Sequence, residues 1–306
     1  MAKESFRHLS LVVIVLCLLV AGALLYSTVH QLGIDLDPGY DGVPSELHEA
    51  AASGDLTRVR ALIDAGADLE SPLDEPGRRD MTPLMVACQM GREDAASALL
   101  DAGADIERRT NLRWSALTYA AGWGDAATID LLIKRRAQIN ARTDKGWTPL
   151  MFAVARGAIE NCRTLVEGGA DIEFRNKYGE TALLLASGTG DVAKIELLLD
   201  AGATIDLGDH EGNTPLMRAS GSNGPVEAVE VLLRRGAEPD AQNVDGLTAL
   251  MVAADQGRAD LVAVLLDAGA DPSIRDSSDR TALVWANMHE DGQGDAAALI
   301  EAALDR

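Results

Sequence analysis

The sequence predicts an all-α fold: a solenoid of about eight helix-turn-helix repeats, preceded by one transmembrane helix. Three observations lead to this prediction. A Thr or Ser recurs every 33 or 34 residues from Thr82 onward, and a Gly-Ala pair recurs in step with it. A run near the N-terminus, residues 9–26, contains no charged side chain. A fixed period of this length indicates stacked units that bury their apolar faces against one another.

The uncharged run LSLVVIVLCLLVAGALLY, residues 9–26, predicts a membrane-spanning helix. Eighteen helical residues rise about 27 Å, close to the thickness of a bilayer core. We interpret the run as an uncleaved signal anchor between a short cytosolic N-terminus, 1–8, and a polar linker, 27–43. The alternative is a signal peptide cleaved near Ala23, after the small residues Ala21-Gly22-Ala23. Cleavage would produce a secreted, untethered protein.

The charges flanking this run predict its orientation. Lys3 and Arg7 precede it, and the next basic residue is Arg58. Basic residues favour the cytosolic side of a membrane helix. We therefore expect a single-pass protein with its repeats on the non-cytoplasmic side, which is the periplasm if the source is bacterial.

The repeat register divides the rest of the chain, residues 44–306, into eight units. The recurring Thr or Ser falls at Thr82, Ser115, Thr148, Thr181, Thr214, Thr248 and Thr281. The first unit begins near Ser45. The units lie near 44–70, 81–107, 114–140, 147–173, 180–206, 213–240, 247–273 and 280–306.

Each unit is predicted to contain two short helices. The Thr or Ser would cap the first helix, and a following Pro suits the first helical position because its missing N–H costs nothing there. The second helix would end at the Gly of the Gly-Ala pair, where a positive φ is often required. Arg136 occupies this Gly position in one unit. A positive φ there would cost roughly 1 kcal/mol.

These motifs resemble ankyrin repeats. The family motif Thr-Pro-Leu-His is nearly matched by Thr82-Pro83-Leu84-Met85, Thr148-Pro149-Leu150-Met151 and Thr214-Pro215-Leu216-Met217. The family's His is present only as His48, and its place in later units is taken by Met85, Thr118, Met151, Leu184, Met217, Met251 and Val284. This departure predicts a less polar seam between units. The resemblance implies binding of a protein partner on the concave face, formed by the loops, or fingers, and the first helices.

Composition excludes several other functions. Asp and Glu outnumber Lys and Arg by 48 to 27, a net charge of −21, so the surface repels phosphate and nucleic-acid binding is not expected. The three cysteines show no paired spacing, so we expect neither a disulfide framework nor a metal site. The five His residues are scattered and form no catalytic motif. We expect no cofactor and no enzymatic activity.

The family resemblance places a set of basic, aromatic and Met side chains at exposed positions of the predicted binding face, including Trp114, Trp123 and Trp147. Trp, Tyr and Arg are enriched in the residues that dominate binding energies, and a partner with acidic and apolar groups would suit such a surface. An alternative is internal stacking, in which Trp147 lies on Arg113 or Arg175 of a neighbouring finger. The predicted partner-binding residues are Arg78, Arg79, Met81, Met90, Arg113, Trp114, Trp123, Lys145, Trp147, Arg156, Lys177 and Tyr178.

The function predicted from these features is that of a membrane-tethered, non-catalytic scaffold or adaptor that binds a protein partner. The alternative that corresponds to signal-peptide cleavage is a secreted ankyrin-repeat effector or toxin.

Overall fold

A computed structural model of the chain describes residues 45–73, 80–221, 224–288 and 294–305. Within these ranges the regular structure is helical and contains no β-strand, which confirms the predicted all-α solenoid. None of the helices in these ranges is long and apolar enough to cross a membrane. The predicted cytosolic N-terminus, signal anchor and linker, residues 1–43, lie outside the described residues.

The described residues contain eight successive pairs of helices. The first helices of the pairs are α2 (Glu46–Ser53), α4 (Pro83–Gln89), α6 (Ala116–Trp123), α8 (Pro149–Arg156), α10 (Ala182–Thr189), α12 (Pro215–Ser220), α14 (Ala249–Asp255) and α16 (Ala282–Ala286). The second helices are α3 (Leu56–Asp64), α5 (Glu93–Asp101), α7 (Ala126–Lys134), α9 (Ile159–Glu167), α11 (Val192–Asp200), α13 (Val226–Arg234), α15 (Ala259–Asp267) and α17 (Gly294–Leu304).

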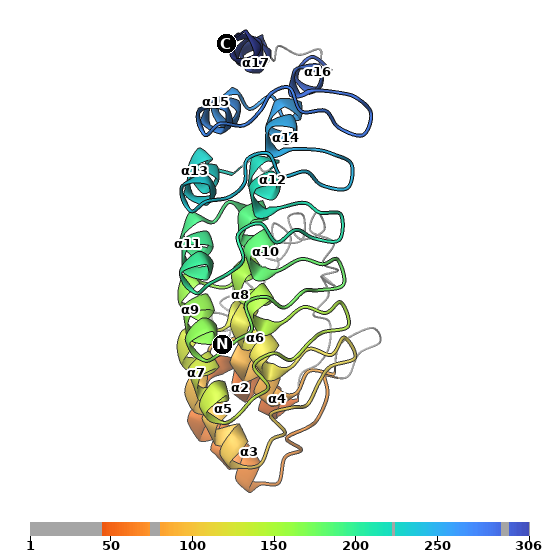
Figure 1. Cartoon of the computed structure of the whole chain (residues 1–306). Helices are drawn as coiled ribbons and strands as arrows, with labels where there is room; N and C mark the ends of the chain where they lie inside the picture. The colour runs from red at the N-terminus through yellow and green to blue at the C-terminus, as the bar shows by residue number, and fades with distance from the viewer. Residues whose placement is uncertain (1–44, 74–79, 222–223, 289–293, 306) are drawn as a thin grey trace, which may run out of the picture. The chain divides into compact units, whose positions relative to one another are not determined.

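The helices of the repeat domain form two rows. Each first helix packs against the first helices of the neighbouring units, and each second helix does the same with the second helices. The loops that connect one unit to the next project beyond the row of first helices (Figure 1). We call these loops fingers and number each by the unit that follows it. The fingers described in full are finger 3 (104–114), finger 4 (137–147), finger 5 (170–180), finger 6 (203–213), finger 7 (237–247) and finger 8 (270–280).

The recurring Thr or Ser begins each first helix in the way the sequence predicts. In units two to seven its side-chain oxygen accepts a hydrogen bond from the backbone N–H three residues later, as in Thr148 with Met151 at 3.4 Å. Pro occupies the first helical turn of α4, α8 and α12. Such a cap is worth about 1 kcal/mol, so most units carry their own local signal for a helix start.

The Gly of each Gly-Ala pair adopts the positive φ that the second helix needs at its end. The values run from 81° at Gly66 to 98° at Gly103, and Arg136 takes the same conformation with φ 65°. The left-handed region is costly for a residue with a Cβ atom. Arg136 therefore stores strain in the third unit, as the sequence predicts.

Replacing Arg136 with Gly should raise the free energy of unfolding by about 0.5–1 kcal/mol. The relief of the left-handed strain, about 1–2 kcal/mol, exceeds the entropy that Gly loses on folding, about 0.5–1 kcal/mol. Urea unfolding followed by circular dichroism measures the change. Gly103→Arg is the reciprocal control, because an added Cβ atom there meets no atom within 4 Å, and it should destabilise by a similar amount. A destabilised Arg136→Gly variant would contradict the strain argument.

Two glycines allow neighbouring units to approach closely. A Cβ atom on Gly124 would lie 2.3 Å from the carbonyl oxygen of Cys88, and one on Gly157 would lie 2.4 Å from that of Ala121. Both contacts join the end of a first helix to the preceding unit. No side chain fits at these positions without moving backbone atoms.

The seam between units is apolar at its centre and polar at one edge. Met85, Met151, Met217 and Met251 are all buried, in agreement with the less polar seam predicted from the loss of the family His. His48 keeps a polar contact, since its Nε2 lies 3.0 Å from the carbonyl oxygen of Met81 in the next unit. Three later side chains donate hydrogen bonds to carbonyls in the first helix of the preceding unit: Arg92 to Ala52, Asn161 to Ala121, and Lys194 to Val154. In these later units, side chains in the second helix, or just before it, therefore make the polar contacts to the preceding unit.

The two cysteines in the repeat domain, Cys88 and Cys162, are buried and free. Burial raises the pKa of both thiols, that of Cys162 to about 11. The thiolate is the reactive form, so these side chains act as small apolar core residues.

Candidate partner-binding surface

In the structure, three positions in each unit lie beside the finger tips and form the candidate binding surface with them. They are the residue before the helix cap, the fourth residue after the cap and the eighth residue after it. In units two, three and four these positions hold Met81, Val86 and Met90; Trp114, Tyr119 and Trp123; and Trp147, Phe152 and Arg156. We call the surface formed by these positions and the finger tips the finger-helix face. Its character changes along the stack, from aromatic to polar.

Units three and four contribute an aromatic cluster of five side chains: Trp114, Tyr119, Trp123, Trp147 and Phe152. The ring of Trp114 stacks on Trp123 with centroids 5.5 Å apart, and it meets Phe152 edge-on at 4.7 Å. The ring centroid of Trp147 lies 5.3 Å from that of Phe152. Rings in such pairs add about 0.5–1.5 kcal/mol beyond the area that they bury.

The sequence-based expectation that Trp114 and Trp147 are exposed is wrong. Each has a relative exposure of 4%. The reason is the shape of the finger: the backbone N–H of Thr143 donates to the carbonyl of Trp147 at 3.0 Å, which closes a tight hairpin. The closed hairpin returns Trp147 to the base of the finger, against the first helix. The predicted stack of Trp147 on Arg113 or Arg175 is also replaced, because the ring that Trp147 contacts is Phe152.

Trp123 and Arg156 form the half-buried outer edge of the aromatic cluster. The guanidinium carbon of Arg156 lies 5.0 Å from the centroid of the Trp123 ring, a cation–π geometry. The two residues come from equivalent positions in adjacent units, so the arrangement joins α6 to α8. Both side chains stay partly accessible, so the pair places an aromatic ring and a guanidinium group at the finger-helix face.

The fingers are held by a repeated polar turn. The side chain five residues before each cap accepts hydrogen bonds from the finger's own backbone; for example, Asn176 Oδ1 accepts from Tyr178 and Glu180 at 2.8 and 3.0 Å. Asp209, Asn243 and Asp276 do the same in fingers 6, 7 and 8. Thr110 and Thr143 accept from the N–H of Trp114 and Trp147. These bonds fix each finger tip relative to its helix.

Successive finger tips are also bonded to one another. One backbone N–H of each finger donates to a carbonyl of the preceding finger, and the five distances lie between 2.8 and 3.2 Å. The donors are Asp144, Lys177, His210, Val244 and Ser277. The tips therefore form a continuous, ordered edge from finger 3 to finger 8.

Of the predicted partner-binding residues, the structure exposes Met90, Arg113, Lys177 and Tyr178, and it leaves Met81, Lys145, Trp123 and Arg156 partly accessible. Tyr178 is 51% exposed at the tip of finger 5. Arg78 and Arg79 lie outside the described residues. The basic side chains predicted for this surface are present on fingers 3 to 5. Two of the Trp side chains predicted beside them, Trp114 and Trp147, are buried.

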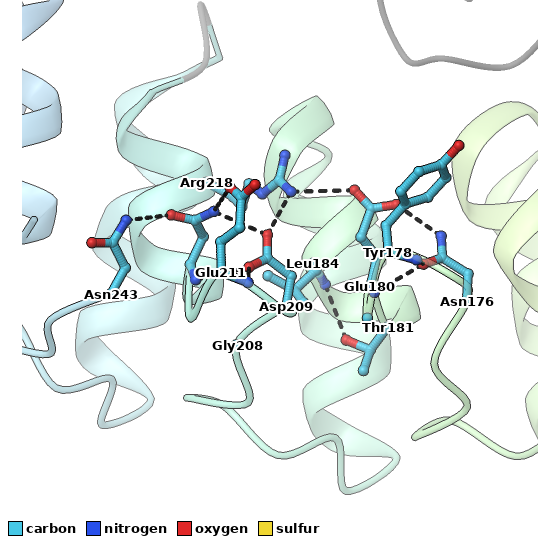
Figure 2. Close-up of polar contacts among 12 residues, drawn as sticks. Asn176, Tyr178, Glu180, Thr181, Leu184, Gly208, Asp209, Glu211, Arg218 and Asn243 are labelled. Carbon is cyan, nitrogen blue, oxygen red and sulfur yellow. Dashed lines mark hydrogen bonds and ion pairs between the residues drawn. The ribbon is translucent and has the colours of Figure 1, made fainter. Parts of the chain in front are cut away.

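A charged network takes the place of the aromatic cluster in units five and six (Figure 2). Arg218 occupies the position equivalent to Tyr119 and Phe152, and its Nη2 lies 2.7 Å from Asp209 Oδ2 and 3.3 Å from Glu180 Oε1. Burial by itself would raise the pKa of Asp209, but hydrogen bonds from Asn213 and Arg218 outweigh burial and hold this pKa below its ordinary value. The network joins fingers 5 and 6 through side chains.

Our sequence-based prediction missed Tyr119, Phe152 and Arg218. The signal that could have found them is the 33-residue register itself, because all three stand four residues after a cap. This position faces the finger, as the contacts of Phe152 with Trp147 and of Arg218 with Asp209 show.

A hollow of about 260 Å³ lies on the other row of helices, between α3 and α5. Its lining includes Arg60, Asp64, Asp94 and Asp101. Small-molecule sites are usually apolar and occupy about 300–1,000 Å³. This hollow is small and charged, so it does not compete with the finger-helix face as a binding site.

Comparison with known proteins agrees with the fold. A family model described as ankyrin repeats (3 copies) matches residues 26–110, 108–176, 168–243 and 221–304. The crystal structure of the ankyrin repeat domain of Bcl-3 superimposes with a TM-score of 0.61 and 26% sequence identity, covering 85% of this chain and 100% of that one.

Two curated proteins share a shorter region with the chain. Inversin from Gallus gallus is 37% identical over 92 residues, and inversin from Mus musculus is 35% identical over 92 residues. The match covers 30% of this chain and 8% of each inversin, so it reports shared repeats and not a shared whole protein. Ankyrin repeats indicate a protein–protein interaction domain. The family model extends over most of the chain, which therefore belongs to the ankyrin-repeat family.

Proposed function

We propose that this protein is a non-catalytic scaffold or adaptor that binds a protein partner through the finger-helix face of units two to five. One observation carries the proposal: an ordered edge of basic finger tips adjoins the Trp123–Arg156 pair on a protein whose net charge is −21. A basic, partly aromatic surface on an acidic protein favours a partner with acidic and apolar groups.

We further propose that residues 9–26 tether the repeats to a membrane and hold them on its non-cytoplasmic side. The support is the uncharged length of the segment and the position of Lys3 and Arg7 before it. A reporter that works only outside the cytoplasm should be active when it is fused after Arg306, and the purified protein should keep Met1. A mature N-terminus at Leu24 would instead support the secreted alternative, and a reporter active only in the cytosol would contradict the orientation.

Tyr178→Ala should weaken binding of the partner at least tenfold and leave the melting temperature nearly unchanged. Tyr178 is exposed at a finger tip, so its side chain contributes contact area to a partner and little to the core. The partner is identified by a photo-crosslinking amino acid placed at position 178 of the full chain, followed by mass spectrometry. Affinity is then measured with the purified pair.

Leu304→Ala is the matched control, since Leu304 is a similarly exposed apolar side chain on α17 in the other row of helices. It should not change affinity. A crosslinker at Glu196, exposed on α11, should capture no specific partner. Equal capture from positions 178 and 196 would exclude the finger-helix face as the binding site.

A further inference from the structure

The charge balance of the fingers changes along the stack, from nearly neutral to strongly acidic. Fingers 3, 4 and 5 contain seven basic and six acidic residues. Fingers 6, 7 and 8 contain two basic and nine acidic residues. The acidic half follows the composition of the whole chain, whereas the nearly balanced, locally basic half departs from it.

The basic side chains at the tips of fingers 3 and 5 are available to a partner. Arg113 and Lys177 are exposed, and neither forms an ion pair with any residue that the structure describes. On fingers 6 to 8 the basic residues are already engaged: Arg275 pairs with Asp279, and Arg280 pairs with Asp276. Intramolecular ion pairs therefore neutralise both basic residues of finger 8, whereas Arg113 and Lys177 keep exposed charges at the tips of fingers 3 and 5.

The acidic half presents its own charges at equivalent positions. Glu211 and Asp245 are exposed at the tips of fingers 6 and 7, and within the described ranges they form no ion pair. Val244, 69% exposed, stands beside Asp245. Tyr178, on the boundary between the halves, provides the other exposed apolar group of the edge.

The backbone bonds between tips set the spacing of these charges. Each finger is a hairpin with two chain segments, and hydrogen-bonded segments lie about 5 Å apart, so the repeat along the edge is about 10 Å. Arg113 and Asp245 stand four units apart, on fingers 3 and 7. They are therefore separated by about 40 Å, which an extended peptide covers with about 12 residues at 3.3 Å each.

We propose that the partner segment that lies along this edge is an extended peptide with blocks of opposite charge, about 12 residues long. Its acidic block lies over the tips of fingers 3 to 5, and its basic block lies over fingers 6 and 7. The inference rests on the proposed function and adds the chemistry and the register of the ligand. Nucleic acid does not fit, because half of the edge is acidic. A second copy of the chain is disfavoured by the repulsion between two proteins of net charge −21.

Defined peptides test the charge pattern. The block peptide has five Asp or Glu, a Leu-Tyr centre and five Lys or Arg, and the control peptide has the same composition with alternating charges. Binding to the full-length protein in neutral detergent is measured by fluorescence anisotropy at low salt. The block peptide should bind at least tenfold more tightly than the alternating one, and the difference should shrink as salt rises.

Charge reversals at the two ends test the register. Lys177→Glu should weaken an acidic-block half-peptide at least fivefold and leave a basic-block half-peptide unaffected. Glu211→Lys should do the opposite. Both side chains are exposed, so each variant should keep its melting temperature, which serves as the control for folding.

Equal affinity for the block and alternating peptides, or half-peptides that respond to the wrong reversal, would overturn the inference. Dimerisation of the full chain that either reversal abolishes would assign the edge to a second copy and also overturn it. A partner crosslinked at position 178 whose affinity is unchanged by both reversals would refute the charge register while the proposed function stands. No crosslinked partner at all would refute the proposed function itself.

Discussion

Replacing Trp114 with Ala should lower the free energy of unfolding by about 3–5 kcal/mol, the range for truncating a large aromatic side chain in a core. Trp114 is almost fully buried and contacts Tyr119, Trp123 and Phe152. Removing it leaves a cavity at the junction of α6 and α8. Because repeat proteins are stabilised by neighbouring units, units three and four should unfold at a lower urea concentration than the rest.

Two variants control for this interpretation. Trp114→Phe keeps a ring in the cluster and should cost less than half as much. Trp123→Ala removes a half-buried ring from the same cluster and should also cost less. Urea unfolding followed by tryptophan fluorescence and by circular dichroism measures all three. A Trp114→Ala variant as stable as the wild type would show that Trp114 is a surface residue, as our sequence-based interpretation held.

Asp209→Ala should lower the free energy of unfolding by about 2–4 kcal/mol at neutral pH. The Asp209 carboxylate accepts hydrogen bonds from the backbone of Glu211 and Asn213 and from the side chains of Asn213 and Arg218. Truncation leaves these donors without their acceptor, at about 1–3 kcal/mol for each group that stays buried. Asp209→Asn should cost only about 1 kcal/mol, because Asn176 and Asn243 hold the same turn in neighbouring fingers.

The pH dependence of stability separates the charge of Asp209 from its hydrogen bonds. Since the pKa of Asp209 is lower in the folded protein than in the unfolded chain, its contribution is present above about pH 4 and is lost as the pH falls through the folded pKa. The urea midpoint of the wild type should therefore fall between pH 5 and pH 3. Asp209→Asn should show a shallower fall, with a remainder from Asp276, whose pKa is also lowered. An unchanged acid dependence in Asp209→Asn would contradict this role.

The fold could be predicted from the sequence because each unit carries its own local signals for where its helices begin and end. Thr148 caps one helix in the way that the sequence predicted, and Gly169 ends the next with a φ of 91°. Even the strained exception, Arg136, was identified from its place in the register. Short-range chemistry repeated at a fixed period is sufficient for this, since every unit packs only against its neighbours.

The binding surface could be predicted less well from the sequence, because the exposure of a side chain depends on contacts between units. Trp147 precedes a helix cap in a Gly-rich turn, where a side chain is expected to be exposed to solvent. Its burial depends on the closure of the hairpin and on Phe152, which reaches it across the finger. Arg218 is likewise ordinary in the sequence, and only the folded chain places it between Glu180 and Asp209 (Figure 2).

The sequence by itself determined the helices, their caps, the repeat period and the membership of the ankyrin-repeat family, because these follow from residues a few positions apart. Only the tertiary structure decided which aromatic rings are buried, which cations are paired and which remain available on the finger tips. The physical reason is that burial and ion pairing are properties of side chains from different units. Residues such as Trp114 and Phe152, or Glu180 and Arg218, meet because the 33-residue period stacks equivalent positions, and their contacts depend on the exact shape of the fingers between them.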